Sequence, residues 1–71
     1  MNALLPETLK QNAFQDNAWI GENLQHAEYF EAQGMKLAAA CCFEIAGICE
    51  NDRNESAKEY QNITGVGLKF V

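Results

Sequence analysis

The chain is 71 residues long and carries ten acidic against five basic side chains, for a formal net charge of −5. Binding to DNA, RNA or an anionic membrane surface requires clustered cations, so five scattered Lys and Arg residues argue against all three as direct ligands. Hydrophobic residues make up 48% of the chain, which is typical of a folded protein, and we expect a single domain with a thin core over residues 1–71.

A first helix is expected to begin at Pro6, because proline suits the first turn of a helix, where its missing N–H would be unpaired anyway. Leu9 and Ala13 follow at a spacing of four residues and would share one face. The stretch Gln15–Asn17 then contains an Asp and an Asn, which are typical amino-terminal caps. These residues predict a break in the helix, with one long helix through the junction as the open alternative.

The second expected helix runs from about residue 18 to residue 33. Ile20, Leu24 and Ala27 repeat in it at spacings of four and three residues, which is the pattern of a helix face packed on a core. Gly34 follows directly, and glycine ends helices readily because it adopts positive φ without steric cost. We therefore expect a helical hairpin that turns at Gly34.

The third expected helix, from about residue 35 to residue 50, is apolar on nearly every side. Alanine and cysteine dominate its centre, and Ile45 and Ile48 lie on its flanks. Such a helix needs cover on most sides, and a chain of 71 residues has few elements to supply it. We therefore predict a homo-oligomer, most simply a symmetric dimer.

The last third of the chain predicts one short helix and a tail. Capping-box motifs begin at Asp52 and Ser56 and predict a helix over residues 53–62. Residues 67–71 alternate apolar with small or polar side chains, so we expect this tail to be extended. The predicted fold class is therefore all-α, a small domain of three or four helices built on a helical hairpin turning at Gly34, with an extended C-terminal tail.

Small and aromatic residues flank the expected turn at the spacings of a known repeat: Ala27, Phe30, Gly34, Ala39, Phe43 and Ala46. Over residues 27–46 the chain resembles a single tetratricopeptide-like helical hairpin. The resemblance implies two antiparallel helices that pack closely where alanine removes bulk, and a peptide-binding role by analogy of fold. The chain departs from the family pattern at His26, where a large apolar residue is usual, and no second copy of the repeat follows.

Few residues of this chain are suited to catalysis or metal binding, since it has three cysteines and one histidine. A cysteine nucleophile requires a base, a group that orients the base and a pocket, whereas Cys41, Cys42 and Cys49 lie in an apolar stretch with only His26 as a candidate base. Zinc takes about four Cys or His ligands at paired spacings, which this chain does not offer. We therefore expect no enzyme, no catalytic residue, no metal and no cofactor.

The sequence thus predicts a small non-catalytic protein-interaction module of the cytoplasm, an adaptor, inhibitor or regulatory protein of bacterial or phage type. Its partner would be another protein, bound through the apolar surface around Ile45 and Ile48 and through the tail at Leu68, Phe70 and Val71. For the tail, folding back onto the protein's own helices is the open alternative.

An acidic stretch offers a second hypothesis. No Lys or Arg lies between Lys10 and Lys36, whereas four acidic residues do, Glu28 and Glu31 among them. Such a surface would mimic the phosphates of a nucleic acid and inhibit a DNA-handling enzyme by occupying its basic groove. An ordinary solvated face is the simpler interpretation.

Overall fold

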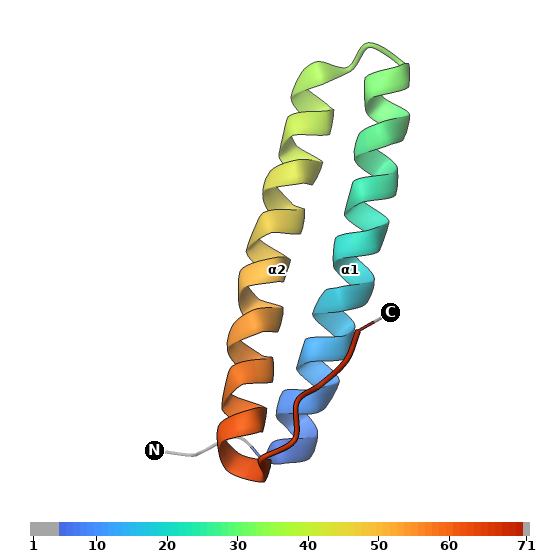
Figure 1. Cartoon of the computed structure of the whole chain (residues 1–71). Helices are drawn as coiled ribbons and strands as arrows, with labels where there is room; N and C mark the ends of the chain where they lie inside the picture. Colours follow the sequence, from blue (N-terminus) through green and yellow to red (C-terminus); the bar gives the residue numbers. More distant parts are fainter. Residues whose placement is uncertain (1–4, 71) are drawn as a thin grey trace.

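Figure 1 shows a computed structural model of the protein, which describes residues 5–70. In that range the chain forms two α-helices and no strand: α1 spans Pro6–Ala32 and α2 spans Lys36–Thr64. The helices pack as an antiparallel hairpin, and an extended segment follows α2. The expected all-α class is confirmed, but the described residues form two helices where three or four were expected.

α1 continues without interruption through the break predicted at Gln15–Asn17. Asp16 does not cap a new helix, because it lies on the buried side of α1. Asn17 instead accepts a hydrogen bond from Arg53 of α2, with 2.9 Å between Nη1 and Oδ1. Both residues with the chemistry of caps are therefore engaged in the contact between the helices.

α2 likewise continues through the polar stretch Asn51–Asn54, where a turn was expected. Asn and Asp each cost up to about 0.7 kcal/mol inside a helix. Packing of the inner side of α2 against α1 offsets this cost. Arg53 and Ser56 are half-buried and extend the inner side of α2 toward its end. The capping-box motifs therefore lie in the middle of one helix and start no new one.

The two helices meet along inner stripes, whose residues alternate at spacings of three and four. This is the spacing of two helices that wind around each other, and every member is buried or half-buried. The inner stripe of α1 comprises Leu9, Ala13, Asp16, Ile20, Asn23, Ala27 and Phe30, and that of α2 comprises Ala39, Cys42, Ala46, Cys49, Arg53, Ser56 and Tyr60.

The core between the inner stripes is thin, because most of its buried apolar members are small: Leu9, Ala13, Ala27, Ala39, Ala46 and Cys49. Alanine lets the helix axes approach closely but removes little apolar area from water. The molecule is accordingly a slab of one helix layer, 45 × 27 × 13 Å in extent. Within residues 5–70 neither helix contains a segment long and apolar enough to cross a membrane.

The connection between the helices ends α1 with a known backbone motif. Gly34 has a φ of 76°, a conformation that favours glycine. Its N–H donates to the carbonyl of Glu31 at 3.0 Å, and the N–H of Met35 donates to the carbonyl of Phe30 at 2.9 Å. This pair of hydrogen bonds is the Schellman pattern, which satisfies the last carbonyls of a helix.

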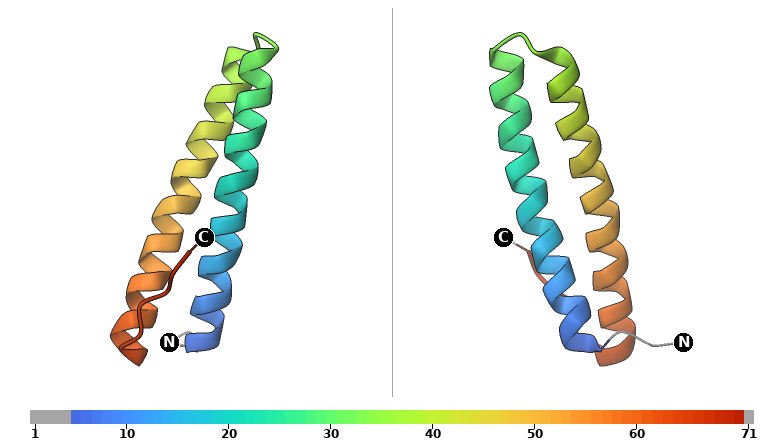
Figure 2. Two further views of the ribbon diagram at one scale, coloured as in Figure 1. Left: turned by 45° about the vertical axis from the view of Figure 1, so that its right-hand side comes forward. Right: turned by 180° about the vertical axis from the view of Figure 1, so that it is seen from behind.

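The C-terminal segment turns back on the hairpin after α2. Gly65 ends the helix with a φ of 77°, and its N–H donates to the carbonyl of Gln61 at 2.8 Å. Residues 66–70 then run back from the end of α2 along α1, as Figures 1 and 2 show from three directions. Leu68 and Phe70 are half-buried by this path.

Candidate binding groove and apolar face

The hairpin has two broad sides, and the C-terminal segment lies on only one of them. On this tail side Phe70 packs against Phe14 of α1, with ring centroids 5.1 Å apart. The opposite side, here called the groove side, is left open by the described part of the chain. On α2 the groove side is formed by residues that again alternate at spacings of three and four: Ile45, Ile48, Asp52, Glu55 and Glu59.

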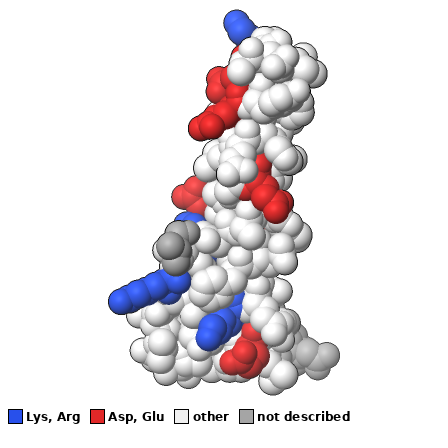
Figure 3. All heavy atoms as spheres, turned by 90° about the vertical axis from the view of Figure 1, so that its right-hand side faces the viewer, with Lys and Arg blue, Asp and Glu red and all other residues white. Residues whose placement is uncertain are grey.

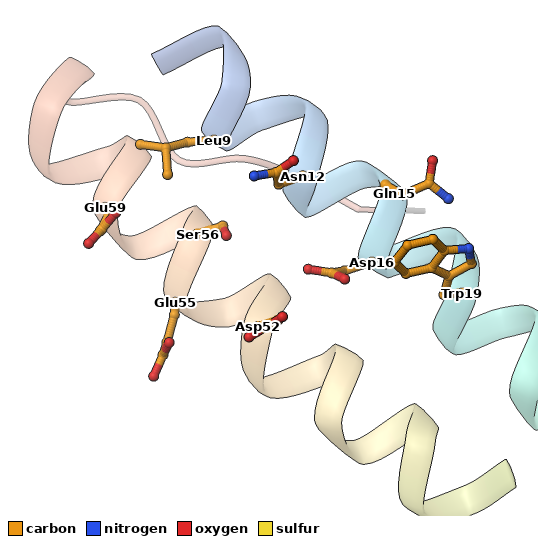
Figure 4. A pocket seen from close by; sticks show the side chains of 9 residues that line it. All are labelled: Leu9, Asn12, Gln15, Asp16, Trp19, Asp52, Glu55, Ser56 and Glu59. Carbon is orange, nitrogen blue, oxygen red and sulfur yellow. The ribbon is translucent and has the colours of Figure 1, made fainter. Parts of the chain in front are cut away.

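The half of the groove side that is far from the turn is hollowed into an acidic groove of about 350 Å³ (Figure 4). Four of its lining residues carry a carboxylate and none carries a positive charge, among the residues described. The lining comprises Leu9, Asn12, Gln15, Asp16 and Trp19 from α1, and Asp52, Glu55, Ser56 and Glu59 from α2.

Asp16 is the innermost carboxylate of the acidic groove. Its side chain extends from α1 toward α2, where Asp52 lies opposite (Figure 4). Asp16 is only 8% exposed, and within residues 5–70 its carboxylate has no hydrogen bond or ion pair. Burial, and next the negative charge of Asp52, raise the pKa of Asp16 above its ordinary value. This is the pattern of an acid that lacks a cation.

Arg53 is the cation that would be expected to pair with Asp16. Both residues belong to the inner stripes, and they lie at nearly the same level of the antiparallel hairpin, one residue apart in their separation from Gly34. The guanidinium group is nevertheless held on the tail side. It donates to Asn17 and lies 5.0 Å from the ring centroid of Phe70, a favourable cation–π contact. Asp16 therefore stays without a counter-charge.

Cys49 is not an activated thiol. Burial, followed by the negative charges of Asp16 and Asp52, raises the pKa of Cys49, and a raised pKa keeps the thiol neutral and weakly nucleophilic. Among residues 5–70 no group of three or more His, Cys, Asp or Glu side chains is arranged to hold a metal ion. The carboxylates of the acidic groove therefore line its walls and do not converge on one point.

An apolar face continues the groove side toward the turn; we define it as Trp19, Ile45 and Ile48. Trp19 lines the end of the acidic groove, and the two isoleucines precede Asp52 on the same stripe of α2. Trp19 and Ile45 are each 46% exposed, and Ile48 is 58% exposed. On α2 the groove side thus changes along its length from apolar to acidic, whereas α1 adds Glu22 three residues after Trp19.

The partner-binding residues predicted from the sequence fall into three groups. Ile45 and Ile48 lie together on the apolar face. Positions 14, 17, 21, 24, 28 and 31 of α1 alternate at spacings of three and four residues and so form one stripe. Glu28 and Glu31 therefore lie on the tail side, as Phe14 and Asn17 do. Figure 3 shows that the acidic side chains on the face it presents form separate groups and not one row.

The third group is the tail. Leu68 and Phe70 pack back onto the hairpin, which is the arrangement that was left open as the alternative to docking on a partner. Val71 lies outside the described residues. Sequence reasoning missed the acidic groove, because it predicts that Asp16 caps a helix. The available signal was its spacing of three residues from Ala13 and four from Ile20, which places an acid on the buried stripe.

Comparison with known proteins found no match, either among protein-family models or among curated proteins and solved structures.

Proposed function

We propose that this chain is a small non-catalytic protein-interaction module, which binds a helix of another protein along its groove side. The observation that carries this proposal is the apolar face, where Trp19, Ile45 and Ile48 are about half exposed over a core made mostly of alanine. Large apolar side chains gathered at a surface mark interaction sites, and a hairpin of this size gains much of its stability from such contacts.

The change from apolar to acidic along the groove side favours a particular partner. A helix with apolar residues over one stretch and Lys or Arg over the next would match the apolar face and the acidic groove at once. Its anchors would recur at spacings of three and four residues, as in other complexes where a helix binds a groove. The complex would be a three-helix bundle, in which the partner helix supplies the large side chains that the core lacks.

A second copy of the chain matches the groove side less well. In the dimer predicted from the sequence, each copy brings the same four groove carboxylates. Neither the α1 positions that line the groove nor the stripe of α2 from Ile45 to Glu59 contains a Lys or Arg to meet them. Like charges facing each other oppose association, so we favour a partner with basic residues over a homodimer.

The distribution of acidic residues also bears on the phosphate-mimic hypothesis. The carboxylates of the acidic groove and those of Glu28 and Glu31 lie on opposite sides of the hairpin. A mimic of a nucleic-acid strand needs its charges in a row that one basic groove can contact. The arrangement therefore supports the protein-interaction module over the mimic.

A synthetic helical peptide tests the proposal. The peptide carries leucines at spacings of three and four residues over two turns and arginines at the same spacings over the next two. Trp19, the single tryptophan, reports binding by fluorescence. We expect saturable binding that Ile48→Glu abolishes and Leu37→Glu leaves intact. Leu37 is the matched control, because it is 86% exposed near the turn.

Two results would overturn the proposal: the absence of saturable binding, or unchanged binding by the Ile48→Glu variant. Replacing the arginines of the peptide with glutamates should weaken binding if the acidic groove takes part. Sedimentation of the isolated chain tests whether a second copy of the chain binds the groove side instead. A dimer that Ile48→Glu dissociates, and Leu37→Glu does not, would assign the apolar face to a second copy.

A further inference from the structure

We infer that the acidic groove is a binding site for one guanidinium or alkylammonium group, supplied by an Arg or Lys side chain of a partner protein. The inference deepens the proposed function, since the groove is the acidic half of the same side, and it assigns a chemical role to Asp16. Its test uses a short arginine peptide and the fluorescence of Trp19, which lines the groove, and does not depend on Ile45 or Ile48.

Asp16 is the observation that distinguishes a site from an ordinary acidic surface. Surface carboxylates are solvated and need no partner, whereas Asp16 is only 8% exposed as a residue and only its carboxylate oxygens still reach the water of the groove. It has received no hydrogen bond in return within residues 5–70. A carboxylate that is partly desolvated and has no cation beside it is disfavoured in its charged form, and a cation entering the groove would relieve that cost.

The shape and lining of the acidic groove favour an organic cation over a metal ion. The carboxylates are spread along the groove and form no metal-binding cluster among residues 5–70. A long basic side chain carries an apolar stem, for which Leu9 and Trp19 offer apolar contact. The indole ring of Trp19 also lines the groove, and its face attracts guanidinium and ammonium groups.

The protein's own cation is kept out of the acidic groove. Arg53 is held on the tail side by Asn17 and Phe70, although it shares the level of Asp16 in the hairpin. The groove is consequently open to a cation from outside. Arginine suits the site best, because its planar donor group forms two parallel hydrogen bonds with a carboxylate.

The test is a fluorescence titration of Trp19 with the short peptide acetyl-Ala-Arg-Ala-amide. The same peptide with citrulline is the ligand control, since citrulline keeps the shape of arginine and lacks its charge. We expect Asp16→Asn to weaken binding of the arginine peptide roughly tenfold or more. Glu28→Gln removes one negative charge from the tail side, so it should leave binding nearly unchanged. Asp16→Asn removes a buried charge, and its melting temperature checks that the variant is folded.

Each arm has an outcome that overturns the inference. Equal binding of the citrulline peptide would show that the charge is not recognised. Equal weakening by Asp16→Asn and Glu28→Gln would show attraction to net charge without a site. Spermidine or magnesium chloride at matched ionic strength, if bound in preference to the arginine peptide, would assign the groove to a free cation and not to a side chain. Binding of the arginine peptide stands as support even if the leucine–arginine helix fails to bind.

Discussion

Asp16 sets the pH dependence expected for the stability of this hairpin. Its folded-state pKa is raised from 3.8 by burial and by Asp52, so the folded protein holds a proton more tightly than the unfolded chain does. Stability therefore rises as pH falls through the raised pKa toward 3.8, and the cost of the buried charge is fully present at neutral pH. Glu55 and Glu59 of α2 share the groove and add negative charge of the same sign.

We predict that Asp16→Asn stabilises the protein at neutral pH, because the amide needs no counter-charge. Urea unfolding followed by circular dichroism, at a series of pH values, measures the effect. The advantage over the wild type should shrink as pH falls and should disappear below pH 3.8, the ordinary pKa of an aspartic acid. An Asn variant that is less stable than the wild type at pH 7 would show that Asp16 has a stabilising partner.

Gly34 is a second residue whose backbone conformation makes a prediction. Nothing lies within 4 Å of the position that a Cβ would take there, so a side chain would meet no clash, but the φ of 76° remains unfavourable for it. We expect Gly34→Val to lower the free energy of unfolding by more than about 1 kcal/mol. Gly21→Ala is the control; that position is helical and equally open, and alanine there should stabilise by up to about 1 kcal/mol.

At the scale of the helices, the sequence predicted the hairpin well and the helix lengths badly. The periodicity of Ile20 and Ala27 is a local signal, and the hairpin that it helps to predict is formed by α1, which ends at Ala32, and α2, which begins at Lys36. Asp, Asn and Ser are ambiguous, because the same polar side chain can cap a helix or contact a neighbouring one. Which of the two roles such a side chain has depends on the residue that it meets in the folded protein. Asn17 meets Arg53 across the hairpin, and these residues are too distant in sequence for their contact to be predicted from spacing.

The C-terminal segment provides a prediction for an element. Phe70 joins Phe14 and Arg53, so Phe70→Ala removes an aromatic pair and a cation–π contact. We expect a loss of about 1–2 kcal/mol in the free energy of unfolding. Lys69→Ala changes the exposed neighbour and should stay within about 0.5 kcal/mol of the wild type. If the two variants have equal stability, the segment does not pack on α1 in solution.

At the scale of the whole molecule, a one-layer hairpin depends on very few large buried side chains. Leu9 is the largest fully buried one among the described residues, and truncating such a leucine costs about 2–5 kcal/mol. A chain this small has roughly 3–5 kcal/mol in total. We therefore predict that Leu9→Ala leaves the isolated protein largely unfolded at 25 °C, as helical ellipticity at 222 nm would show. Leu5→Ala, at an exposed position near the same end of α1, should fold normally.

A ligand that contacts the folded groove side should restore helicity to the Leu9→Ala variant, because binding to the folded state alone shifts the folding equilibrium. The leucine–arginine helix provides this rescue if it contacts the apolar face, and its glutamate counterpart should rescue less. If both peptides restore helicity to the same degree, binding rests on apolar contacts alone and the acidic groove contributes nothing.

The position of Arg53 also links the two sides of the slab energetically. If the C-terminal segment undocks, the guanidinium loses Phe70 and keeps only its hydrogen bonds to Asn17 and Asn54. Exchanging these neutral acceptors for the carboxylate of Asp16 would make Arg53 an internal competitor for any incoming cation. Docking of the tail and occupancy of the groove are then coupled, and coupling of this kind is reciprocal. Phe70→Ala should weaken binding of the arginine peptide by some factor. The peptide, in turn, should strengthen docking of the tail by the same factor, although the two never touch.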